Sequence, residues 1–259
     1  VKQCPVGGVI HVSEGLYRWD GSIKIRSGLK QESLDGGIHI SGRDSPVLMG
    51  QWLLGLGSAG SVRSVGLAAN LSHEFESLLD IHSGPWKFER CECRSVKGQV
   101  VNVCKLGEAD FNGCTLAGMG AEENLRASVG AFVTDWGSVR FELCSFSSFG
   151  LLDIGLQEED PSHEEEEFGR SNSEEEEHVD RDFNEKLGSK NDSQAEVFDK
   201  LKLGFGLFID GDGHVHCVNS SFSDCHIGVV LMANSSAVVA QSTFFKDVTF
   251  GAFYVDELA

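Results

Sequence analysis

The clearest candidate for chemistry in this 259-residue chain is a short acidic run followed by histidine, Asp210-Gly211-Asp212-Gly213-His214. Two carboxylates separated by one glycine can bind a hard cation or flank a sugar. His214 is the histidine nearest to this acid pair. The same residues also suit a tight turn between strands, because Asp and Gly supply turn hydrogen bonds and positive φ. Asp210, Asp212 and His214 are therefore candidate binding residues, and no residue is assigned as catalytic.

A second polar set belongs to short runs of four mostly apolar residues, of which the first is Leu78-Leu79-Asp80-Ile81. Further runs start at Val100, Ala131, Leu151, Leu207, Val229 and Ala252. Asp80, Asn102 and Asp153 occupy the third position of three of these runs. If the runs stack, these side chains either form a shallow groove for a sugar or a peptide or merely face solvent. Asp80, Asn102 and Asp153 are the remaining binding candidates.

Charged side chains form a further row, one position after the start of a longer repeated phrase. They are Lys87, Asp110, Arg140 and His216. Alternating sign on neighbouring strands predicts a charge ladder on the surface, in which each exposed pair contributes only about 0–1 kcal/mol.

The longer phrase sets the architecture that must position all these groups. It spans eight residues, with small or apolar residues at its first, third, sixth and eighth positions. Its six copies start at Gly60, Trp86, Ala109, Val139, Val215 and Ala237. Repeats spaced 20–50 residues apart indicate a solenoid. Together with the four-residue runs, each repeat supplies about three short strands, and each strand pairs with its copy about 4.8 Å away. We therefore expect an all-β solenoid of about nine coils.

The eight cysteines are interpreted as structural thiols. Cys91, Cys114 and Cys144 share one position of successive phrases, so they should form a ladder of small residues inside the stack. Thiols on neighbouring parallel strands are close but are not well directed for disulfide bonding. No Cys-x-x-Cys pattern is present, and we predict no metal site and no cofactor.

The cysteines also indicate the cellular location of the protein. Reduced thiols in this number favour an intracellular location, in the cytoplasm or nucleus. Four Asn-x-Ser patterns keep secretion as the alternative, and they begin at Asn70, Asn191, Asn219 and Asn234.

One acidic segment interrupts the repeat. Residues 157–199 carry 17 Asp or Glu and 4 Lys or Arg, whereas the whole chain has a net charge of −19. The segment has too few apolar residues to offset the entropy lost on ordering. We therefore expect a disordered loop, inserted between the coils of residues 1–156 and the coils of residues 200–259 in one domain. Ser162, Ser171 and Ser173 precede acidic residues and are candidate phosphorylation sites.

The opening segment Gly8–Tyr17, an extended apolar strand followed by Gly15-Leu16-Tyr17, resembles the entry of pectin-lyase-like domains. The resemblance covers nearly the whole chain except 157–199 and implies a right-handed parallel β-helix. Phrases that end in Cys-x-Leu or Cys-x-Phe are most similar to non-enzymatic eukaryotic members, such as F-box-only adaptors and Shc-binding or spindle-associated proteins. Galacturonidases of this fold carry Gly-His-Gly and Arg-x-Lys motifs, and neither motif is found here in the form that those enzymes have.

These observations favour a monomeric, non-catalytic recognition module that binds a protein or glycan partner within a larger intracellular protein. The first residue is Val1, and we expect the chain to be a piece of a longer protein. A secreted polysaccharide lyase or glycoside hydrolase is the first alternative, and a structural spacer is the second. The acidic balance disfavours nucleic acid, and no apolar stretch approaches the roughly 18 residues that span a bilayer.

Overall fold

The computed structural model describes residues 7–25, 37–55, 57–73, 76–119, 127–150, 203–232, 234–240 and 243–256. Across these ranges the chain forms 20 strands and no helix. The coils before and after the gap at 151–202 belong to one compact unit. The acidic segment, with Ser162, Ser171, Ser173 and the nearby Asp153, lies outside the described residues.

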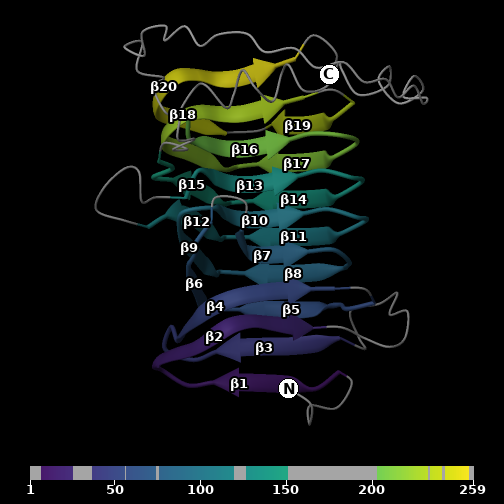
Figure 1. Ribbon diagram of the computed structural model, residues 1–259, viewed down its shortest axis with the longest axis vertical. Helices are drawn as coiled ribbons and strands as arrows, with labels where there is room; N and C mark the ends of the chain where they lie inside the picture. The colour runs from purple at the N-terminus through teal and green to yellow at the C-terminus, as the bar shows by residue number, and fades with distance from the viewer. Residues whose placement is uncertain are drawn as a thin grey trace, which may run out of the picture. The chain divides into compact units, whose positions relative to one another are not determined.

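Sheet A forms one side of the stack and contains the first half of each repeated phrase (Figure 1). Its eight strands follow one another in chain order, and every pairing is parallel. They are β1 (Val9–Val12), β3 (Ile38–Gly42), β5 (Gly60–Arg63), β8 (Trp86–Glu89), β11 (Glu108–Asn112), β14 (Ser138–Glu142), β17 (His214–Val218) and β19 (Ser236–Ala240).

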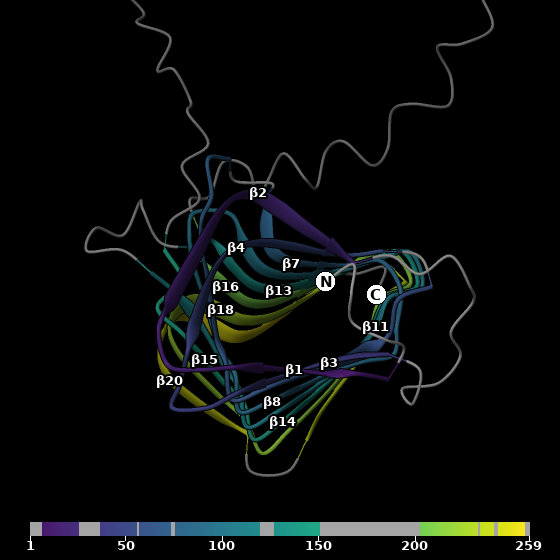
Figure 2. The same cartoon turned by 90° about the horizontal axis from the view of Figure 1, so that it is seen from below.

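Sheet B has twelve strands and folds around the other two sides of each coil, so that every coil is three-sided in the view along the stack (Figure 2). Its strands are β2 (Leu16–Ile25), β4 (Val47–Leu54), β6 (Gly66–Asn70), β7 (Ser77–Ile81), β9 (Glu92–Val96), β10 (Gln99–Val103), β12 (Thr115–Gly118), β13 (Val129–Val133), β15 (Ser145–Ser147), β16 (Phe205–Ile209), β18 (Ser221–Leu231) and β20 (Phe244–Val255). The expected all-β parallel solenoid is confirmed, but it has about seven turns rather than nine.

The first five copies of the repeated phrase fold as predicted, with their two halves on sheets A and B and their apolar positions in the interior. The prediction is wrong by one residue at the end of the sixth copy, because Phe245 rather than Phe244 pairs with Phe222, and Phe244 is 67% exposed. Equivalent rings from successive coils therefore lie one above another. The centroids of Phe88 and Phe111 are 4.6 Å apart, and those of Phe111 and Phe141 are 5.1 Å apart. The ladder continues on sheet B, where the Phe146 and Phe222 centroids are 4.6 Å apart. The spacing of parallel strands thus places the rings within the favourable range for stacking.

The cysteines form the predicted ladder of buried free thiols. The Sγ atoms of Cys91, Cys114 and Cys144 each donate to a backbone carbonyl of the preceding coil, over 3.3–3.4 Å. Ser220 continues the ladder, because its Oγ accepts a hydrogen bond from the Cys144 amide at 3.1 Å. Burial raises the pKa of Cys217 to about 11, so this thiol stays protonated near neutral pH.

The register of the four-residue runs differs from the sequence expectation by one position after the second run. Leu79 pairs with Val101, which pairs with Ala131, so the run begins at Gly130 rather than at Ala131. Glycine occupies that first position because the interior has no room for a side chain there. A Cβ atom on Gly130 would lie 2.6 Å from the Phe149 ring.

The described chain returns to the stack close to where it leaves it. A Cβ atom on Gly204 would lie 2.5 Å from the carbonyl oxygen of Phe149 and 2.7 Å from that of Gly150. Strand β16 pairs directly with β13, so residues 205–209 take the place in sheet B that the sequence assigned to the run at Leu151. The two ends of the intervening segment can therefore be joined by a short linker.

Replacing residues 157–199 by about six Gly and Ser residues should leave one cooperative unfolding transition. Each halving of a loop recovers roughly 0.6 kcal/mol of closure entropy, so we expect about 2 kcal/mol of added stability. Urea unfolding followed by circular dichroism measures this difference. A shortened chain that loses cooperativity would show that the segment contributes to folding.

Candidate functional site

The sequence candidate Asp210-Gly211-Asp212-Gly213 forms the turn between β16 and β17. The Gly213 amide donates to the Asp210 carbonyl at 3.0 Å, and the Gly211 amide donates to the Asp210 carboxylate at 2.8 Å. Gly211 and Asp212 have φ values of 39° and 59°. Two central residues with positive φ are typical of a type I′ turn.

The same turn recurs at two earlier coils that lack a carboxylate pair. The Gly107 amide donates to the Cys104 carbonyl at 2.9 Å, and the Gly137 amide donates to the Thr134 carbonyl at 2.8 Å. The stacked turns also bond to one another, because the Asp135 amide donates to the Gly211 carbonyl at 2.9 Å. Asp210 and Asp212 thus have a structural role that accounts for their spacing.

The second candidate pair, Asp80 and Asn102, lies on the outer surface of neighbouring strands β7 and β10. The two residues are in register, and Asn102 Nδ2 donates to Asp80 Oδ1 at 2.8 Å. The polar row extends over these two coils alone among the described ones, because Leu53 precedes Asp80 and Phe132 follows Asn102. The structure therefore brings two of the three predicted groove residues together, and Asp153 lies outside the described residues.

Two residues that the sequence analysis did not select complete this polar group. His82 Nε2 lies 2.9 Å from Asp80 Oδ1, and Cys104 lies at the same place on the next coil. Burial, followed by the charge of Asp80, raises the pKa of Cys104 to about 11. A nucleophilic cysteine needs the opposite shift, so the Cys104 thiol is not activated for attack. Both residues could have been recognised in the sequence, because each directly follows a four-residue run.

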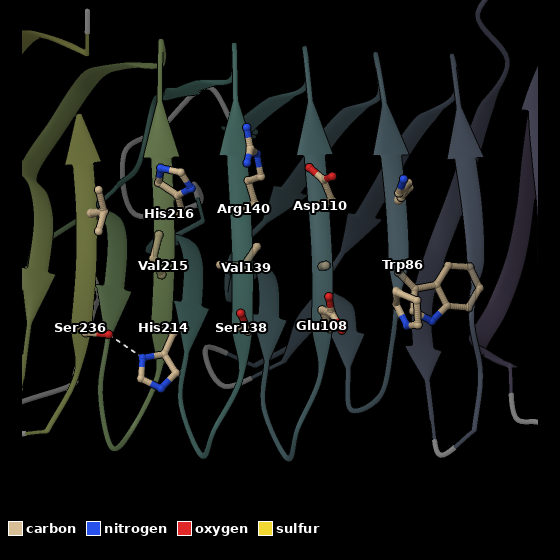
Figure 3. A pocket seen from close by; sticks show the side chains of 14 residues that line it. Trp86, Glu108, Asp110, Ser138, Val139, Arg140, His214, Val215, His216 and Ser236 are labelled. Carbon is tan, nitrogen blue, oxygen red and sulfur yellow. Dashed lines mark hydrogen bonds between the residues drawn. The ribbon is translucent and has the colours of Figure 1, made fainter. Parts of the chain in front are cut away.

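The outer face of sheet A carries a shallow hollow of about 360 Å³, which we call the sheet A hollow. Its charged row is Lys87, Asp110, Arg140 and His216, which the strand register places side by side. A second row consists of Glu108, Ser138, His214 and Ser236. Figure 3 shows the two rows side by side on neighbouring strands, with Asp110, Arg140 and His216 labelled in the first and Glu108, Ser138, His214 and Ser236 in the second.

The side chains of the hollow differ in how strongly they are held. Arg140 is paired with Glu142 at 3.0 Å, and His214 Nδ1 forms a hydrogen bond with Ser236 Oγ. No ion pair or hydrogen bond of the Lys87 or Asp110 side chains is found with the described residues. These two charges therefore remain available to a ligand.

The charge ladder was predicted from the sequence, but the hollow was not. Glu108, Ser138, His214 and Ser236 each lie one position before the start of a repeated phrase. That position is polar in four successive coils, and this is the signal that would have identified the second row. His214 therefore belongs to the sheet A hollow rather than to a site with Asp210 and Asp212.

No protein-family model, no curated protein sequence and no solved structure matches this chain in the comparisons made with each. In the described part of the chain, no helix has the length and apolar character needed to cross a membrane.

Proposed function

We propose that this solenoid is a non-catalytic recognition module of a larger intracellular protein, and that it binds a protein partner at the sheet A hollow. The observation that supports this most is the alternation of Lys87, Asp110 and Arg140 on neighbouring strands, about 4.8 Å apart. Such a pattern can match the charges of a partner surface and exclude a partner of the wrong pattern.

The lining of the hollow favours a protein over a glycan. Sugars are commonly held against an exposed Trp, Tyr or Phe ring, and Trp86, the one such residue among the described residues that line the hollow, is 0% exposed. Val238 is 56% exposed at the edge of the hollow and offers an apolar contact beside the charges. Protein interfaces combine apolar and polar contacts of this kind.

The sequence resemblance supports the same assignment. The opening segment Gly8–Tyr17 and the repeated phrases resemble pectin-lyase-like domains, and among these the non-enzymatic adaptors most of all. In those proteins the β-helix recognises a partner rather than cleaving a polymer. The buried free thiols are consistent with a reducing, intracellular setting.

One observation favours glycoside hydrolysis as a second candidate function. Glu108 and Asp110 both line the hollow and lie two residues apart on β11, about 6.7 Å along the strand. Inverting glycosidases hold their two carboxyl groups roughly 6.5–9.5 Å apart. Both acids, however, extend from one side of the hollow, whereas an acid and a base must act on opposite faces of the sugar.

Reversing two charges of the hollow should weaken partner binding. We expect Lys87→Glu combined with Arg140→Glu to weaken capture of the protein partner by at least about 10-fold, since rim charges steer association and fix orientation. Quantitative affinity capture from cell extract, with wild-type and variant chains compared, measures the loss. Arg94→Glu is the matched control, because Arg94 is an exposed residue of β9, which belongs to sheet B.

The same variants separate the two candidate functions. Partners lost equally with Arg94→Glu and with the double variant would refute binding at the hollow. Release of reducing ends from acidic polysaccharide by the wild-type chain, abolished by Asp110→Asn, would establish the hydrolase instead.

A further inference from the structure

Four polar side chains gather at one corner of the stack, two from each of two neighbouring coils. Asp80 and His82 come from the end of β7, and Asn102 and Cys104 come from the end of β10. The parallel pairing of Asp80 with Asn102 stacks His82 on Cys104 as well, because both residues lie two positions further on. We call these four residues the Asp80 cluster. It lies on sheet B and contributes nothing to the sheet A hollow.

The cluster has the dimensions of a metal site. One carboxylate oxygen of Asp80, one ring nitrogen of His82 and the Sγ atom of Cys104 all lie within 4.8 Å of one another. Bonds of about 2.0–2.3 Å in a tetrahedral zinc site place neighbouring ligand atoms roughly 3.3–3.7 Å apart. The closest pair, His82 Nε2 and Asp80 Oδ1, is 2.9 Å apart. Side-chain rotations would therefore have to adjust these distances when an ion binds.

The chemical nature of the ligands selects the metal. Thiolate and imidazole together favour zinc over magnesium or calcium, which require oxygen ligands. All the ligand-bearing residues are at least partly shielded. The Asp80 and His82 side chains are 30% and 23% exposed, and Cys104 is 6% exposed. Shielding of this kind protects a bound ion from exchange with water.

The side-chain amide of Asn102 offers a fourth ligand to the same cluster. The Oδ1 atom of Asn102 is buried and has no hydrogen-bond partner among the described residues. The Nδ2 atom of the same amide faces Asp80 Oδ1 at 2.8 Å and Cys104 Sγ at 3.9 Å. A half-turn of the amide exchanges its two ends and directs Oδ1 toward the space between Asp80 and Cys104.

We propose that Asp80, His82 and Cys104 bind a Zn²⁺ ion, with Asn102 Oδ1 as the fourth ligand. Four protein ligands close the coordination sphere, as in structural zinc sites. Because the ligands come in pairs from two coils, the ion fastens β7 to β10 across their shared corner. Its binding requires loss of the Cys104 thiol proton, which zinc induces on coordination. The site is independent of the proposed partner binding.

The test uses the full chain, reduced and freed of metal with a chelator. Zn²⁺ alone is added in competition with a chromophoric chelator, and we expect one ion per chain. Cobalt in place of zinc should give a thiolate-to-metal charge-transfer band. Cys104→Ser and Asp80→Asn should each weaken zinc binding by at least about 100-fold, beyond the 10–100-fold typical of residues that only support a ligand. Either variant should remove or shift the cobalt spectrum.

Two control variants test specificity. Cys225→Ser removes another buried thiol, and His73→Gln removes an exposed histidine near the opposite end of β7. Both should bind zinc as the wild type does. Zinc should also slow the alkylation of Cys104 by iodoacetamide, measured by peptide mass spectrometry, and this wild-type readout holds even if Cys104→Ser does not fold. The proposal is overturned if no zinc binds, if Asp80→Asn binds it unchanged, or if Cys104 alkylates equally with and without zinc.

Discussion

Replacing Phe111 by alanine should destabilise the solenoid by about 3–5 kcal/mol. Phe111 is 0% exposed and is stacked between Phe88 and Phe141, with ring centroids 4.6 and 5.1 Å away. The substitution removes the apolar burial of the ring, leaves a cavity and breaks two aromatic contacts at once. Domains of this kind have a total stability of about 5–15 kcal/mol, so at least about a fifth of it is at risk.

Urea unfolding at equilibrium, followed by circular dichroism, measures this loss. Trp136→Ala is the matched control, because Trp136 is an aromatic residue of a turn and is 59% exposed. That change should stay within about 0.5 kcal/mol, as is usual at the surface. Equal losses in the two variants would contradict a core that depends on the phenylalanine ladder.

The fold could be predicted because small and apolar residues recur at equivalent positions of successive coils. In the interior of a solenoid each residue meets its own copy, so a single phrase specifies strand, bend and core together. Phe88, Phe111 and Phe141 therefore have the same neighbours in the structure as in an alignment of the phrases. The cysteine ladder was predictable for the same reason.

The register of sheet B was harder to predict, because the four-residue runs are apolar almost throughout. A shift by one residue leaves such a run equally apolar, so hydrophobicity does not fix it. What fixes it is the close approach of a ring to the first position, where glycine alone fits at Gly130 and Gly206. That constraint comes from another strand of the same coil, and no local pattern reveals it.

The candidate sites depend even more on contacts between coils. Asp210 and Asp212 were selected for their spacing, but that spacing serves a turn that two other coils make with different residues. His82 and Cys104 are 22 residues apart and belong to no common motif, and they meet only because β7 and β10 pair in register. Glu108 and His214 meet at the sheet A hollow through the intervening strand β14.

Replacing Gly206 by alanine should destabilise the chain by about 1–3 kcal/mol, through overpacking alone. The residue lies in strand β16 and its φ is not positive, so alanine can adopt its backbone conformation. The added Cβ atom, however, would lie 2.5 Å from the Phe222 ring and 2.6 Å from the Gly228 carbonyl oxygen. The ring is held between Phe146 and Phe245, and the carbonyl belongs to the neighbouring strand, so neither neighbour can yield without disturbing the stack.

Gly251 provides the matched comparison, since it also lies in a strand of sheet B. Its nearest atom to an added Cβ is the Phe253 carbonyl oxygen, at 3.6 Å. Gly251→Ala should therefore be neutral or should stabilise the chain by up to about 1 kcal/mol, because alanine reduces the entropy of the unfolded state. Gly206→Ala should therefore be less stable than Gly251→Ala by at least about 1 kcal/mol, and urea midpoints measured side by side reveal this difference. A Gly206→Ala chain as stable as Gly251→Ala would mean that the rings of sheet B pack more loosely than this register requires.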